Sequence, residues 1–341
     1  MSEQSVETTQ PPTRPPTPAA AAWAGGCGRT ASAFALWVLR RQLRAVRSWV
    51  RRVGGDHAPE LEAVHQLRVA TRRARAALQL FGSWLPARHG RWLERRLKDL
   101  RRAAGKIRDL DVLGQRLAVA RQDEDDRRSA RGWTALERLL AARRRRAARP
   151  LRRAGARWAR REDRRRFRAL LTGVRWRGSG PEPTVAQAAR AALASRVDKL
   201  RAAARRLREI DDLHRLRIRA KQLRYTLELL APVLDEAVVA QRAFAAMQRD
   251  LGAVHDHAVA LETFTRWRRK PKFAAARRVL EARIAAERGR LDAATERFRR
   301  RWKGAKRRAL AESLAGLAGG SEVRGPTDSG VPGAQDRDTA E

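Results

Sequence analysis

The stretch VHQLRVATRRARAALQLF, from Val64 to Phe81, carries two helical patterns side by side. Apolar and small residues recur at alternating steps of three and four, the spacing of a helix face that packs on a core. This first apolar seam consists of Val64, Leu67, Thr71, Ala74, Leu78 and Phe81. One residue later, at the same steps, follows the first basic stripe, which consists of His65, Arg68, Arg72 and Arg75. Successive helix residues are about 100° apart, so the stripe borders the buried face.

The basic stripe has a physical cost in an isolated helix. Like charges at these spacings repel by a few tenths of a kcal/mol per pair, and an ordinary soluble helix would intersperse glutamates. A row of uncompensated cations beside an apolar seam predicts a groove or channel that receives an anion. The alternative is a solvated flank whose counter-charges come from neighbouring helices.

The same arrangement recurs 149 residues further along the chain. The second apolar seam consists of Leu213, Leu216, Ala220, Leu223, Leu227 and Leu230. The second basic stripe consists of His214, Arg217, Lys221 and Arg224. A further match sets GKIRDLDVL (Gly105–Leu113) against GAVHDHAVA (Gly252–Ala260) at an offset of 147. Two matches in the same order predict a duplicated unit, the alternative being chance similarity in a sequence rich in arginine, alanine and leucine.

The rest of the chain is also helical in pattern, because apolar positions recur every three to four residues and β-branched residues are sparse. The Gly/Pro-rich stretch from Thr172 to Thr184 divides the chain into two halves. Pro150 is expected to kink or split the last helix of the first half. Short connections between long helices predict antiparallel neighbours and an all-α fold of two four-helix bundles. The predicted helices cover residues 31–53, 59–83, 90–121 and 131–168, then 185–208, 211–231, 236–266 and 274–315.

The two ends of the chain differ from the helical part in composition. Residues 1–28 are rich in proline, threonine and alanine, and residues 318–341 are polar and acidic, so both are predicted to be disordered tails. The ordered part then covers residues 29–317, with the first bundle at 29–172 and the second at 184–317. An apolar fraction of 43% is sufficient for a core of that size.

The charge of the chain limits the classes of partner that we expect it to bind. There are 77 basic and 37 acidic residues, which gives a formal net charge of +40. Such a charge repels itself, so we expect an anionic partner: nucleic acid, an anionic membrane surface or a phosphate polymer. The planar arginine side chain suits phosphate because it donates two parallel hydrogen bonds. A GC-rich genome is the alternative explanation for part of the arginine excess.

Cysteine usage and hydropathy indicate the cellular compartment of the protein and whether it crosses a membrane. Cys27 is the single cysteine, so neither a disulfide within the chain nor a cysteine-based metal site can form. This favours a reducing cytoplasm. No apolar run approaches about 18 residues, so we expect no membrane span.

The paired motifs resemble the CHAD family, named for conserved histidines in an α-helical domain. The resemblance rests on the pattern H-x-x-R-x-x-x-R-x-x-R in the two basic stripes and on the two glycine-containing segments, and it covers residues 30–315 or so. It implies two four-helix bundles related by a pseudo-twofold axis, with basic side chains lining a surface or pore between them. It implies binding of inorganic polyphosphate, frequent association with polyphosphate granules, and no catalysis.

The resemblance also implies a set of binding residues. The two stripes contribute His65, Arg68, Arg72, Arg75, His214, Arg217, Lys221 and Arg224. The second segment of the motif adds Lys98, Arg101, Arg108 and His255, and Arg73 and Arg102 are expected as neighbours. Asp109 and Asp256 are expected to orient an arginine or histidine, or to act as caps or internal ion-pair partners, rather than to contact the ligand. His257 departs from the pattern of the first half.

Enzyme motifs are incomplete in this sequence. Triphosphate-tunnel enzymes carry E-x-E-x-K, and Glu60–Glu62 begins that pattern, but Val64 occupies the lysine position. A P-loop would require an earlier glycine before Gly105, where the chain has leucine. His255 and His257 are two residues apart on a helix and so point about 200° apart, which prevents them from sharing a metal ion. The sequence therefore predicts no catalytic residues, no metal and no cofactor.

Binding of RNA or DNA is the alternative function. Single-strand binders interleave cations with aromatic rings, because stacking contributes about 1–3 kcal/mol per base. The first stripe contains no aromatic ring and Tyr225 only adjoins the second. All tryptophans except Trp23 are predicted to pack within the bundles. The stripes thus favour phosphate without bases, and the predicted location is the cytoplasm, at polyphosphate granules.

The histidines are expected to act as conditional cations. An imidazole with a pKa near 6.5 is half charged close to cytoplasmic pH, and adjacent phosphate would raise that pKa. The matching positions of His65 and His214 predict that polyphosphate binds more tightly as the pH falls from about 8 to about 6.

Overall fold

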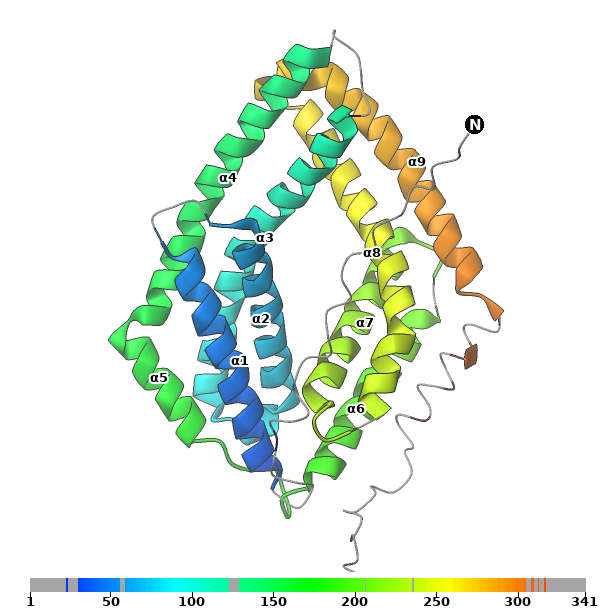
Figure 1. The fold of residues 1–341 in the computed structure, drawn as a ribbon. Helices are drawn as coiled ribbons and strands as arrows, with labels where there is room; N and C mark the ends of the chain where they lie inside the picture. Colours follow the sequence, from blue (N-terminus) through cyan, green and yellow to red (C-terminus); the bar gives the residue numbers. More distant parts are fainter. Residues whose placement is uncertain are drawn as a thin grey trace, which may run out of the picture.

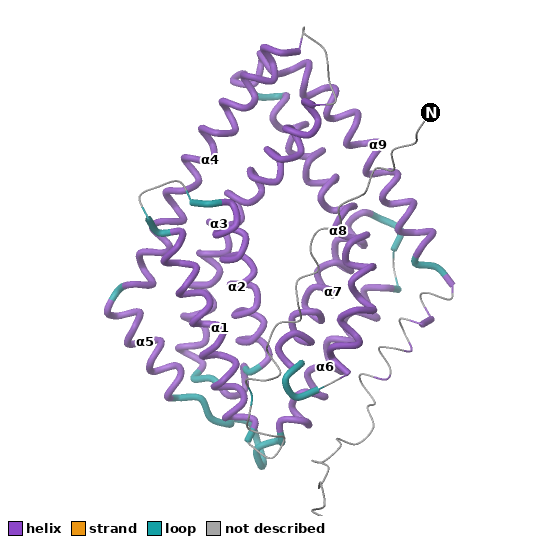
Figure 2. Tube along the Cα trace, viewed as in Figure 1, coloured by secondary structure: helices purple, strands orange, loops and turns teal. Residues whose placement is uncertain are grey.

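The computed structural model describes residue 23 and residues 30–55, 59–122, 129–205, 207–234 and 236–304, with residues 308, 309, 312 and 316 beyond them. The predicted tails and Cys27 lie outside these residues, except for Trp23. Across the described residues the chain is helical and forms no strand, which confirms the all-α fold (Figures 1 and 2). The first half contains α1 (Ala31–Val53), α2 (Leu61–Leu80), η2 (Gly82–Trp84), α3 (Ala87–Gln122), α4 (Ala130–Ala159) and α5 (Arg161–Thr172). The second half contains α6 (Val185–Ala204), α7 (Ile210–Leu230), α8 (Glu236–Arg268), η4 (Pro271–Ala276) and α9 (Arg277–Arg301).

Pro150 does not split the last helix of the first half, which is one of its two predicted effects; the helix breaks further along. α4 continues through Pro150 to Ala159, and Arg160 adopts an extended backbone before α5 begins. A proline inside a helix costs about 3 kcal/mol. Pro150 itself is exposed, whereas Ala148 and Leu151 beside it are buried in the core, so packing offsets this cost and retains the helix.

The predicted apolar seams of α2 and α7 are confirmed, since every one of their residues is buried. Thr30 and Thr184 pair across the two halves in an isolated antiparallel bridge. They directly precede Ala31 and Val185, the first residues of α1 and α6. Each threonine side chain also caps the helix that it precedes. The starts of two helices from different halves are thereby held together.

The two halves share their hydrophobic core. The larger cluster of buried residues includes side chains from α1 to α9 and so crosses from one half to the other. A smaller cluster lies where the ends of α3 and α8 meet the beginnings of α4 and α9, at the top of Figure 1. All ten tryptophans pack on these clusters, Trp23 included, which places this residue of the predicted tail against α1.

The helices of the repeat occupy comparable positions in the two halves. α2 and α7 start 149 residues apart (Leu61 and Ile210), and so do α3 and α8 (Ala87 and Glu236). α2 contacts α7, so the helices that carry the basic stripes are neighbours, while α4 contacts η4 and α9 at the far end of the molecule (Figure 1). The correspondence supports the predicted repeat, and its origin by duplication into two four-helix bundles stays a prediction.

Candidate functional site

The packing of α2 against α7 brings residues of both basic stripes to one pocket of about 270 Å³, which we name the basic pocket. Its walls come from α2, α3, α7 and α8. The cations and histidines that line it are His65, Arg68, Arg72, Arg108, Arg116, Arg217, Lys221 and His255. Its acids are Asp109 and Asp256. Neighbouring helices thus supply two carboxylates to the stripes, and among the lining cations Arg72, Arg108 and Lys221 have no carboxylate partner in the described part of the chain.

Both acids orient an arginine. Asp109 accepts a hydrogen bond from Arg68 at 3.0 Å, and Asp256 forms an ion pair with Arg217 at 3.6 Å. The pairs are equivalent in the repeat, and in each the arginine side chain is largely buried while the aspartate is exposed. Arg68 also donates to the carbonyl of Gly105 at 3.1 Å, where a Cβ would lie 3.4 Å from the guanidinium. Both aspartates are thus ion-pair partners of arginines, which agrees with the orienting role and equally with the internal ion pairs expected from the sequence.

Two histidines meet beside the pocket. The Nδ1 atoms of His214 and His255 are 3.3 Å apart, so one must donate and the other must accept. His214 lines an adjoining pocket of about 260 Å³ that shares Arg217 and His255 with the basic pocket. Burial, followed by the charge of Arg217, lowers the pKa of His255 to about 3, so His255 is neutral at physiological pH.

The cations in and beside the basic pocket repel one another. Burial and then the charges of Arg217 and Arg72 lower the pKa of Lys221 to about 7. Burial is the largest cause that lowers the pKa values of Arg68, Arg101 and Arg217. For Arg101, the charges of neighbouring arginines lower the pKa further. The pocket is therefore a region of crowded, desolvated positive charge, which an anion would stabilise.

Other predicted site residues lie outside the basic pocket. Arg73 and Arg224 both pair with Glu228, at 2.7 and 3.1 Å, and Arg75 pairs with Glu94 at 3.2 Å. Lys98 and Arg102 are exposed on α3 and do not line the pocket, whereas Arg101 is half-buried close to Arg72 and Arg75. Contact of any of these residues with a ligand stays a prediction.

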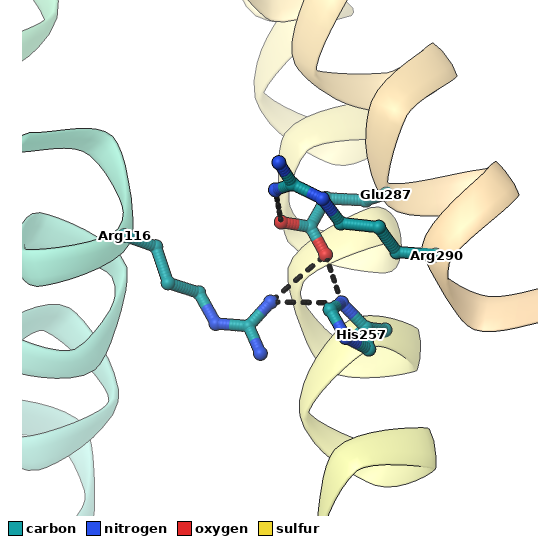
Figure 3. Close-up of polar contacts among 4 residues, drawn as sticks. All are labelled: Arg116, His257, Glu287 and Arg290. Atoms are coloured by element: carbon teal, nitrogen blue, oxygen red, sulfur yellow. Dashed lines mark hydrogen bonds and ion pairs between the residues drawn. The ribbon is translucent and has the colours of Figure 1, made fainter. Parts of the chain in front are cut away.

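The sequence patterns do not single out Arg116, whose side chain reaches from α3 to α8 and α9 (Figure 3). Its Nη1 lies 2.8 Å from Glu287 and 3.1 Å from Nδ1 of His257, and Arg290 lies 3.7 Å from the same carboxylate. Glu287 is buried. Arg116 lies eight residues after Arg108, two turns along the same face of α3, and that spacing is a signal by which it could be found. Glu287 is 171 residues away from Arg116, and no local pattern indicates it.

The contacts of this cluster also explain the role of His257, which departs from the pattern of the first half. Nδ1 of His257 lies 2.6 Å from the Glu287 carboxylate, which can accept a hydrogen bond from it. His255 turns instead towards His214, as the helical spacing predicts. Within the described residues, no group of three or more histidine, cysteine and acidic side chains could hold a metal ion. Nor is any helix in that part of the chain long and apolar enough to cross a membrane.

Comparisons with known proteins identify the family and the fold of the chain. The model of the CHAD domain family matches residues 38–265, well over half of the chain. The crystal structure of the CHAD domain from the plant Ricinus communis superimposes with a TM-score of 0.62 at 23% identity, covering 87% of this chain and 95% of that one. PptA from Streptomyces chartreusis gives a TM-score of 0.60 at 19% identity, covering 81% of this chain and 100% of that one. No curated protein matches the sequence.

At these identities the two solved structures show a shared fold, and the family assignment rests on the match to the family model. That match includes both basic stripes and the two glycine-containing segments. The chain therefore belongs to the CHAD domain family.

Proposed function

We propose that the protein binds inorganic polyphosphate in the basic pocket. The observation that carries this proposal is the meeting of two stripes, 149 residues apart in the chain, around one pocket with far more cations than acids. Membership of the CHAD family supports the identity of the ligand, because the resemblance implies polyphosphate. A polymer in which every unit is a phosphate offers charge along its whole length and needs no other recognition.

The pocket is prepared for such a ligand. Asp109 and Asp256 hold Arg68 and Arg217 in place, so little side-chain freedom is lost when these arginines donate to phosphate oxygens. Arginine donates through a planar fork, whereas Lys221 contributes a compact charge. Bound phosphate would also relieve the repulsion that lowers the pKa of Lys221.

We propose that binding occurs without catalysis. The described lining of the pocket offers no hydroxyl or thiol nucleophile, and both of its acids are paired with arginines. Incubation of the protein with long-chain polyphosphate and Mg²⁺ should leave the chain-length distribution unchanged on a gel. Time-dependent shortening or lengthening in proportion to protein concentration would contradict this part of the proposal.

A competition experiment separates polyphosphate from nucleic acid. Single-stranded RNA at matched phosphate concentration and about 150 mM salt should displace labelled long-chain polyphosphate poorly. The described pocket lining contains no aromatic side chain besides its two histidines, and Tyr225 is buried, so no platform for base stacking is available there. Equal displacement by RNA would make the pocket a general polyanion site.

We further propose that the protein is located at polyphosphate granules in the cytoplasm. A fluorescent fusion tests this location in cells with and without polyphosphate.

A further inference from the structure

A second group of cations lies away from the basic pocket, where α4 packs against η4 near the top of Figure 1. We name it the tip cluster. It consists of Arg143 and Arg146 on α4, Arg266 on α8, and Lys270 and Lys272 around the start of η4. None of these residues belongs to the basic stripes or to the glycine-containing segments.

Arg143 is held in place by aromatic rings. Its guanidinium carbon lies 4.5 Å from the ring centroid of Phe273 and 5.2 Å from that of Trp267, and these two rings stack at 5.0 Å. The turn that presents the lysines is fixed by its backbone, because the N–H of Lys270 donates to the carbonyl of Trp267 at 2.9 Å. The N–H of Phe273 donates in turn to the carbonyl of Lys270 at 2.9 Å. The guanidinium of Arg143 and the backbone turn that carries Lys270 are therefore held in place beside each other.

The charges of the tip cluster are poorly compensated. Arg143 lowers the pKa of Lys272 most, followed by burial and by Lys270 and Arg146, even though Lys272 is exposed. The pKa of Arg143 is lowered by burial and then by Arg146 and Arg266. In the part of the chain that the structure describes, the carboxylate paired with this cluster is that of Glu262, 3.6 Å from Arg266.

The chemistry of the tip cluster favours phosphate over bases. Trp267 and Phe273 are 4% and 1% exposed, and Arg143 lies over both rings. Neither ring is available to stack on a nucleobase, whereas Arg146, Lys270 and Lys272 are exposed and can approach phosphate oxygens. These cations would select an oxyanion with several closely spaced charges.

We propose that the tip cluster is a second site for condensed phosphate, so that a sufficiently long polyphosphate chain binds the basic pocket and the tip cluster together. The identity of the ligand rests on the proposed function. Arg266, the member of the tip cluster on α8, lies eleven residues after His255 of the pocket, a rise of about 17 Å that inorganic triphosphate cannot span. Binding at the first site raises the effective concentration of the same chain at the second, so chain length itself becomes a determinant of affinity.

The test compares two ligands and three variants. The tip variant carries Lys270→Ala and Lys272→Ala, the pocket variant carries Arg72→Ala and Lys221→Ala, and the control carries Arg164→Ala and Arg165→Ala. The control residues are exposed on α5, and their replacement removes the same formal charge as each of the other two variants. In the tip variant we expect the affinity for long-chain polyphosphate to fall by about tenfold, and the affinity for triphosphate to stay within about twofold of the unaltered protein.

The outcomes separate the two proposals. Unchanged long-chain affinity in the tip variant, or an equal fall in the control, overturns the second site and leaves the pocket intact. A pocket variant that binds both ligands normally, beside a tip variant that does not, overturns the pocket and retains the tip. If RNA displaces long-chain polyphosphate from the pocket variant at matched phosphate, the tip cluster is a nucleic-acid surface and its assignment to condensed phosphate is wrong.

Discussion

Lys221 shows how burial and charge compete within the basic pocket. Its pKa is lowered to about 7 by burial and by Arg217 and Arg72, so its charge is conditional near neutral pH. Burial and Arg108 lower the pKa of His65, and that of His255 falls to about 3. The sequence suggests His65 and His214 as conditional cations, and the structure adds Lys221 as a further conditional cation.

We expect polyphosphate affinity to fall as the pH rises from about 6 to about 8. In the free protein Lys221 loses its proton near pH 7, whereas adjacent phosphate raises its pKa, so binding above pH 7 takes up a proton. Titration calorimetry at fixed salt in two buffers of different ionisation enthalpy measures both the affinity and the proton uptake. Lys221→Arg keeps the charge at every pH and should flatten the profile. An equally steep profile in that variant would assign the pH dependence to other groups.

At the scale of helices, α2 and α7 combine an apolar seam with a basic stripe, and both features could be predicted because each repeats every three to four residues. The offset of 149 residues indicated which helices correspond, and the pairs Arg68–Asp109 and Arg217–Asp256 reproduce that correspondence in space. The contacts between α3 and α9 had no such signal, because Arg116 and Glu287 are 171 residues apart.

The link between α3 and α9 should contribute to stability. Glu287→Gln removes the charge from a buried carboxylate that contacts Arg116, His257 and Arg290, and we expect the free energy of unfolding to fall by about 2–4 kcal/mol. Urea denaturation measures this change.

Glu281→Gln is the matched control for that measurement. Glu281 pairs with Arg268 on the surface, with both side chains about half exposed, so its loss should cost less than about 1 kcal/mol. Equal effects of the two substitutions would show that the buried cluster has no special role in holding α3 to α9.

At the scale of the whole molecule, local periodicity predicted the helices but not how they pack against one another. α4 passes through Pro150 because Ala148 and Leu151 are buried beside it, a tertiary effect that outweighs proline's own preference. Arg73 and Arg224 share Glu228 instead of lining the pocket, since that carboxylate lies close to α2 only in the folded protein. The shared core likewise depends on contacts between α2 and α7, which no single helix encodes.

The central claim is that α2 and α7 together form one polyphosphate site, and its most direct test is the affinity of the variant Arg72→Ala, Lys221→Ala for long-chain polyphosphate. Both residues lie beside the buried seams, so circular dichroism should show unchanged helix content. Two charge-assisted contacts of about 1.5 kcal/mol each predict an affinity about 100-fold below that of the control variant Arg164→Ala, Arg165→Ala. An affinity equal to that of the control would contradict the account and place polyphosphate elsewhere on the protein.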